Sequence, residues 1–143
     1  MERNIGRIAA TALGAGFLLA GIIGFINHDF LGLHLSTSHN LVHLISGILA
    51  IYIGLKGSLL AVRVFNLAFG AVYLLLGVAG FIAGGQAEPT AGVPGPGGPY
   101  LWKVIAGMLE LGTVDHLVHI LLGLVFVIGG LLTNPNIERP TRT

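Results

Sequence analysis

The stretch LSTSHNLVHLISG at residues 35–47 recurs later in the chain as LGTVDHLVHILLG at residues 111–123. The segment before each copy is repeated as well, because GAGFLLAGIIGFI at 14–26 returns as GAVYLLLGVAGFI at 70–82. The chain is therefore predicted to be a tandem duplication of a two-helix hairpin, with repeat 1 at about 7–56 and repeat 2 at about 63–132. Each unit holds an even number of spans, so the two copies should share one topology and relate by a pseudo-twofold axis along the membrane normal.

The composition indicates an integral membrane protein. Only 9% of the 143 residues are charged, whereas soluble domains carry roughly 25%, and the mean hydropathy is +0.88. Four apolar stretches stand out, at Ile8–Ile26, Leu41–Leu55, Val64–Ala83 and Leu117–Leu132. A crossing needs about 20 residues, so the second should begin near Thr37 and the fourth near Thr113. The predicted fold class is all-α, a single domain of four transmembrane helices.

Charge placement predicts the orientation. The basic residues that flank the spans on one side are Arg3, Arg7, Lys56, Arg63, Arg139 and Arg142. Only Lys103 lies on the other side, so both termini are expected in the cytoplasm, in a bacterial cytoplasmic membrane. Seven basic residues spread along the chain form no patch for nucleic acid. The absence of cysteine excludes disulfides, thiol catalysis, c-type haem attachment and self-ligated iron–sulfur clusters.

The two copies differ by an insertion at 84–99, which is rich in glycine and proline. Such a composition does not support a packed fold, so we expect a mobile extracytoplasmic loop. Tyr100 and Trp102 then return the chain to the bilayer surface as aromatic anchors. Residues 100–111 are expected to form a short helix lying on that surface.

Glycine spacing predicts where helices touch. Gly21 and Gly24, like Gly77 and Gly80 in the second copy, lie three residues apart on one helical face. Small residues at that spacing allow backbones to approach closely inside a membrane. We expect these glycines at helix crossings, within one chain or in a homo-oligomer.

Histidines provide the candidate site. Asn40, His43 and Gly47 share one face of their helix, and the equivalent face carries His116, His119 and Gly123. A polar side chain at that depth should face the bundle interior and find a partner. In one interpretation these residues only form hydrogen bonds between helices. In another, His43 and His119 bind the iron of a haem b or of another tetrapyrrole, and the glycines leave room for the macrocycle.

A metal ion without a macrocycle is the further alternative. Its candidate ligands are His39, His43, Asp115, His116 and His119, with Glu110 nearby. Imidazoles with a carboxylate suit Zn²⁺ or Cu²⁺. Helical geometry argues against convergence, because His39 lies about 40° around the helix from His43. His28 and His34 are expected to be solvated in the outer loop.

These motifs resemble a bacterial family of small four-helix membrane proteins known only as a domain of unknown function. The likeness lies in the duplicated hairpin and in its motifs, Asn40-Leu-Val-His43 before Gly47 and His116-Leu-Val-His119 before Gly123. The resemblance implies four spans and cytoplasmic termini. It marks His43 and His119 as motif positions, and it implies no activity.

The expected function is a non-enzymatic accessory or cofactor-holding subunit with a His-lined site near the extracytoplasmic side. The alternative is a small transporter or channel that moves protons or metal ions through that cavity. An enzyme is disfavoured, since the sequence has no paired carboxylates, nucleophile or redox thiols. The expected partners are the lipid bilayer and either further copies of the chain or a larger membrane complex.

Overall fold

Four long helices build the molecule. The computed structural model describes residues 4–138. The helices are α1 (Ile5–Ile26), α2 (Thr37–Lys56), α3 (Leu59–Ala83) and α4 (Thr113–Leu131). The predicted starts at Thr37 and Thr113 are confirmed, and each helix is long and apolar enough to cross a membrane. These properties suggest a multi-pass membrane protein.

The connections are short, apart from the one between α3 and α4. Two 3-10 turns, η1 (Phe30–Gly32) and η2 (Pro135–Glu138), follow α1 and α4. Strands β1 (Trp102–Ile105) and β2 (Leu109–Leu111) form an antiparallel hairpin. The prediction of a surface helix over 100–111 is therefore wrong. Gly107, at φ 75°, turns the chain where a right-handed helix would need negative φ, and β-branched residues precede it.

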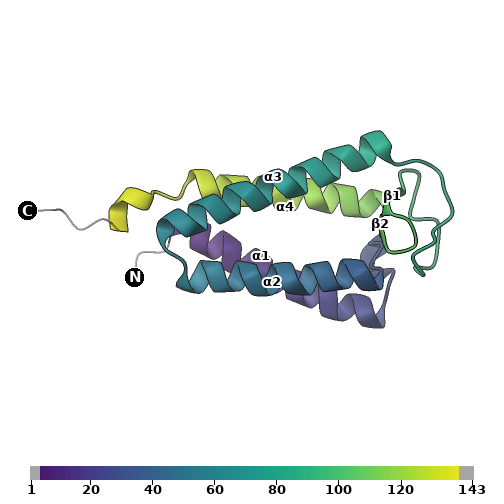
Figure 1. The fold of residues 1–143 in the computed structure, drawn as a ribbon, viewed down its shortest axis with the longest axis horizontal. Helices are drawn as coiled ribbons and strands as arrows, with labels where there is room; N and C mark the ends of the chain where they lie inside the picture. The colour runs from purple at the N-terminus through teal and green to yellow at the C-terminus, as the bar shows by residue number, and fades with distance from the viewer. Residues whose placement is uncertain (1–3, 139–143) are drawn as a thin grey trace, which may run out of the picture.

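The helices are arranged as two pairs, α1 with α2 and α3 with α4 (Figure 1). Glycine makes both pairings possible. A Cβ at Gly21 would lie 2.9 Å from the Asn40 carbonyl oxygen, and one at Gly77 would lie 2.6 Å from that of His116. Gly24 similarly lies against the Asn40 side chain. The prediction of helix crossings at the small residues is confirmed within the chain.

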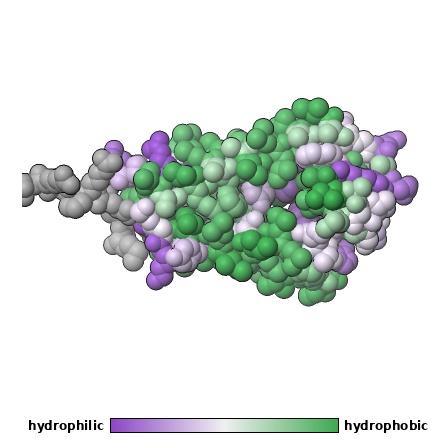
Figure 2. All heavy atoms as spheres, viewed as in Figure 1, coloured by the Kyte–Doolittle hydropathy of each residue, from purple (hydrophilic) through white to green (hydrophobic). Residues whose placement is uncertain are grey.

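The two ends of the bundle differ. At the end that carries the start of α1 and η2, here called the terminal end, Arg7 donates to the Gly54 carbonyl and Arg63 to that of Thr133, both at 3.2 Å. At the opposite end, here called the loop end, lie the hairpin and the Gly/Pro-rich segment (Figure 1). Polar residues gather at both ends, and apolar side chains cover the length between them (Figure 2).

The Gly/Pro-rich segment packs onto the bundle, so the expectation that its composition precludes packing is wrong. Val93 and Leu101 are buried, and Gly85 pairs with Leu101 in a short bridge. The Gly97 carbonyl accepts the Thr113 N–H at 2.9 Å. The segment therefore covers the loop end and joins the start of α4.

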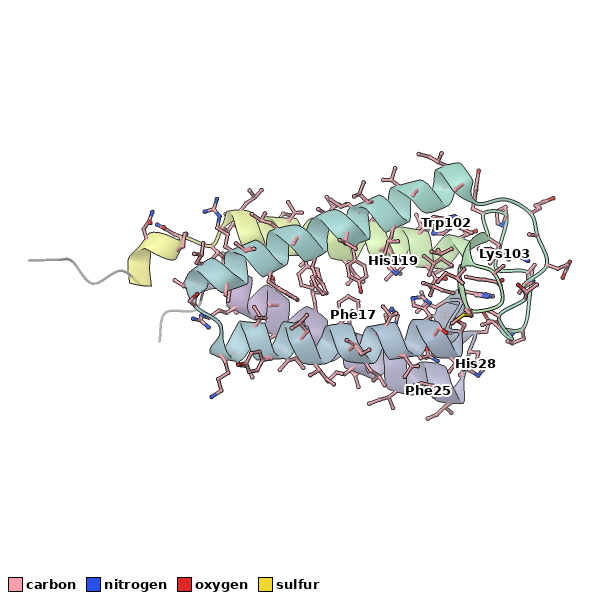
Figure 3. All side chains as sticks on the ribbon, in the orientation of Figure 1. Phe17, Phe25, His28, Trp102, Lys103 and His119 are labelled. Atoms are coloured by element: carbon pink, nitrogen blue, oxygen red, sulfur yellow. The ribbon has the colours of Figure 1, made fainter. Side chains whose placement is uncertain are left out.

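An aromatic cluster fills the space between the two helix pairs. Phe17, Tyr73 and Phe126 are all buried there, with ring centroids 5.1–6.3 Å apart. Phe65 and Phe69 pack against them. Figure 3 shows Phe17 between the pairs, with His119 on the same inner side nearer the loop end. The cluster thus lies next to the histidines, on the side of them that faces the terminal end.

Candidate metal centre

Three buried histidines converge between α2 and α4 near the loop end. His39 and His43 lie one turn apart on α2, and His119 lies in the second turn of α4. Their exposed fractions are 2%, 5% and 3%. One ring nitrogen from each lies within 4.8 Å of the other two. We call these residues the His trio.

A backbone contact fixes the His39 ring. Its Nδ1 lies 2.9 Å from the His34 carbonyl oxygen. A carbonyl only accepts hydrogen bonds, so Nδ1 must carry the proton, and the lone pair is left on Nε2. That Nε2 is buried and has no hydrogen-bond partner. Metal-ligating histidines are commonly oriented in this way by a carbonyl on the second ring nitrogen.

The other two rings of the trio also carry unpaired polar atoms. Nδ1 of His43 and Nδ1 of His119 are buried without a hydrogen-bond partner. The rings lie against aromatic side chains, with His43 at 5.5 Å from Phe17 and His119 at 5.2 Å from Tyr73. A buried polar group without a partner costs about 1–3 kcal/mol. Three buried rings that each carry an unpaired nitrogen, and that also lie within 4.8 Å of one another through one nitrogen each, indicate a ligand.

Asn40 and His116, which align in the predicted repeat, bind loops and lie outside the trio. The Asn40 Nδ2 donates to the Leu35 carbonyl at 3.2 Å, and His116 Nε2 bonds to the Tyr100 carbonyl at 2.7 Å. A Cβ added at Gly80 would lie 2.1 Å from the His116 ring. Each side chain thus ties the segment before its helix to the bundle.

Gly47 and Gly123 lie at helix crossings. A Cβ at Gly47 would lie 2.8 Å from the Gly14 carbonyl oxygen, and one at Gly123 would lie 2.7 Å from the Leu74 backbone nitrogen. Both glycines therefore allow close packing inside a helix pair, α1 on α2 and α3 on α4. The space they leave is filled by the neighbouring helix.

Asp115 takes the place in α4 that His39 takes in α2, and its role is different. Its Oδ2 accepts the Gly112 N–H at 2.6 Å and the His34 N–H at 3.0 Å. The carboxylate thereby caps the start of α4 and holds the loop before α2.

Of the five candidate ligands, the structure brings together His39, His43 and His119. The 40° offset between His39 and His43 does not prevent this, since their ring centroids are 4.3 Å apart.

Sequence reasoning missed the role of His34 and Glu110. His34 is buried, so its predicted solvation is wrong, and its Nε2 lies 3.7 Å from the Glu110 carboxylate. Burial lowers the pKa of His34 although the carboxylates of Asp115 and Glu110 oppose that shift. His28 is half-buried, and its Nδ1 bonds to the Leu35 carbonyl.

Glu110 anchors the Gly/Pro-rich segment. Its carboxylate accepts the hydroxyl and the N–H of Thr90, and the N–H groups of Ala91 and Gly107. Burial raises the pKa of this carboxyl, but the hydrogen bonds outweigh that effect and lower it to about 2. The signal available in the sequence was one acidic residue in an otherwise apolar stretch before α4.

A haem between His43 and His119 does not fit this arrangement. An iron midway between two imidazole nitrogens would lie about 2 Å from each, the usual metal–imidazole distance. The His39 nitrogen lies within 4.8 Å of both, so the His39 ring would compete with the porphyrin for the space around the iron. Phe17 and Tyr73 occupy the space next to these histidines, on the side that faces the terminal end. The residues fit a bare ion better than a macrocycle.

Comparison with protein-family models, curated proteins and solved structures found no match to this chain. The resemblance to a bacterial family of unknown function stays a prediction.

Proposed function

We propose that this chain is a small integral membrane protein that binds one transition-metal ion on the His trio, as a non-enzymatic metal-holding subunit. The observation that carries the proposal is the convergence of three buried imidazole nitrogens from two helices within 4.8 Å. Imidazole is a good ligand for zinc and copper. The hydrogen bond from His39 Nδ1 to the His34 carbonyl supports the same interpretation, since it leaves Nε2 free to bind.

The aromatic cluster favours holding an ion over conducting it. Phe17, Tyr73 and Phe126 fill the bundle between the trio and the terminal end, and a path for ions needs a polar lining. An ion would therefore enter and leave through the loop end. The aromatic cluster therefore disfavours the alternative of a channel for protons or metal ions.

We further propose that the chain arose by duplication and lies in a bacterial cytoplasmic membrane with both termini in the cytoplasm. Aligned residues make similar contacts in the two pairs, since Arg7 donates to Gly54 in the last turn of α2 and Arg63 donates to Thr133, two residues beyond the end of α4. Arg7, Lys56 and Arg63 lie near the terminal end, and Lys103 lies in the hairpin at the loop end. This distribution supports an extracytoplasmic loop end.

Metal analysis of the detergent-purified protein tests the metal proposal. The protein is dialysed against Zn²⁺, Co²⁺ or Cu⁺, the last with a reductant, and the metal retained per chain is measured. We expect one equivalent of at least one ion, and its loss in His119→Asn. The matched control is His116→Asn, which places in α4 the residue that α2 has at the equivalent position. Retention of none of the three ions, or full retention by His119→Asn, would refute the proposal.

A further inference from the structure

The His trio differs in donor charge from the zinc sites that include a thiolate or a carboxylate, and shares its neutral donors with those built from three imidazoles and a water molecule. Its three donors are neutral imidazoles, and within residues 4–138 no carboxylate joins them within ligand distance of one another. The nearby carboxylates have other roles, since Glu110 accepts four hydrogen bonds from the loop and hairpin and Asp115 caps α4. An ion bound here would keep its full formal charge.

We propose that the site selects the monovalent ion Cu⁺ over divalent ions such as Zn²⁺. This inference rests on the proposed function, because it presumes that the His trio binds metal. The trio is at most 5% exposed, and its surroundings include the rings of Phe17 and Tyr73. The cost of moving an ion from water into such a medium rises with the square of its charge, so it is about fourfold larger for a dication.

Helix electrostatics act in the same direction. Both α2 and α4 begin beside the site, at Thr37 and Thr113. A helix N-terminus carries roughly half a positive charge, which disfavours a nearby cation in proportion to the charge of that cation. Asp115 offsets this effect at the start of α4, but the first turn of α2 has no acidic residue.

The number of donors also suits Cu⁺. Zinc sites are almost always four-coordinate, with a fourth protein ligand or a water molecule. Three imidazoles satisfy Cu⁺, a d¹⁰ ion that accepts trigonal coordination. The ring nitrogens of the trio lie within 4.8 Å of one another. Metal–nitrogen bonds of about 2.0 Å in a trigonal site would bring them to about 3.5 Å from one another.

Binding needs no redox step. The chain has no cysteine and therefore no thiol that could reduce Cu²⁺. The ion is taken up as Cu⁺, and the imidazole lone pairs displace its previous ligands. Neither the ion nor the protein changes oxidation state.

Competition titrations on the full-length protein in detergent test the selectivity. Cu⁺ is offered anaerobically from its bicinchoninate complex, and Zn²⁺ from a chromophoric zinc indicator. We expect one Cu⁺ per chain, bound at least about tenfold more tightly than Zn²⁺. His43→Asn and His119→Asn should each weaken Cu⁺ binding by at least about 100-fold. Loss of a residue that only orients a ligand typically weakens metal binding by about 10–100-fold. His116→Asn should bind as the wild type does.

X-ray absorption of the Cu⁺-loaded wild type gives a test that does not depend on the folding of any variant. A copper edge typical of three-coordinate Cu⁺ with nitrogen ligands alone is expected. Tighter binding of Zn²⁺ than of Cu⁺ on the same histidines would refute the selectivity and leave the proposed function intact. Failure of both ions to bind would refute the proposed function and this inference with it.

Discussion

Gly24 offers a sharp test of how the two helices of a pair are fitted together. In Gly24→Ala, the new Cβ would lie 2.0 Å from Oδ1 of Asn40, which is far inside van der Waals contact. Asn40 is fully buried, and its Nδ2 holds the Leu35 carbonyl. Its side chain therefore cannot move without losing that hydrogen bond. Overpacking costs about 1–3 kcal/mol, and we expect Gly24→Ala to lower the free energy of unfolding by this amount.

Two further variants separate this clash from a general effect of alanine. Gly16, on the same helix, has nothing within 4 Å of the Cβ it would gain, so Gly16→Ala should be neutral or stabilising by up to about 1 kcal/mol. The three heavy atoms nearest to the new Cβ at Gly24 all belong to the Asn40 side chain, so the double variant with Asn40→Ala should recover about 1–2 kcal/mol relative to additivity. Unfolding in mixed detergent micelles, followed by circular dichroism, measures each value. Equal stability of Gly24→Ala and the wild type, or strict additivity in the double variant, would refute the reasoning.

Three other predictions follow from the fold. A reporter fused after Thr143 should be active only in its cytoplasmic form, and a cysteine-reactive probe should label a cysteine placed within 84–99 from outside; the opposite pattern would reverse the orientation. Glu110 has a pKa lowered from 4.5 to about 2 in the folded protein, so its contribution to stability is complete above about pH 4.5 and is lost as the pH falls towards 2. The protection of the 84–99 amides, measured as the exchange rate relative to the intrinsic rate at the same pH, should accordingly be unchanged from pH 7 to 5 and fall below pH 4, and Glu110→Gln should show the reduced protection at every pH. Asn66 donates to the Gly6 carbonyl at 2.9 Å and joins the two pairs near the terminal end, so Asn66→Ala should cost about 0.6–1.7 kcal/mol in the same unfolding assay, and no loss would show that this bond is dispensable.

Helix positions and helix crossings could be predicted because each depends on local sequence. The length of a membrane crossing places the starts at Thr37 and Thr113, and small residues three apart mark the face where backbones meet. The inward orientation of His43 and His119 could also be predicted, because a polar group at that depth in a membrane needs a partner.

The third member of the trio could not be predicted in the same way. His39 stands where the other repeat has Asp115, so the comparison of repeats gives no support for it. A helical wheel measures only the direction of Cα–Cβ bonds, whereas an imidazole extends several ångströms and can turn. The turn is set by the His34 carbonyl, and His34 lies in a loop whose path no local pattern specifies. The hairpin at 102–111 is hard to predict because Tyr100 and Trp102 favour a helix on the bilayer surface, whereas the reversal at Gly107 depends on a single positive φ of 75°.

On the proposed duplication and the proposed metal centre, the exchange of His39 for Asp115 between aligned positions has a consequence for how such a centre evolves. Two identical hairpins related by a true twofold axis would carry the same residue at both positions. Such a pair would offer four histidines if the position of His39 and Asp115 held histidine in both copies, and two if it held aspartate in both. It would never offer three histidines together with one carboxylate cap. Joining the hairpins into one chain removes that restriction, because each copy can then accept mutations that its twin does not share. An odd number of ligands is thus a property that a fused pair can acquire and a symmetric dimer of single hairpins cannot.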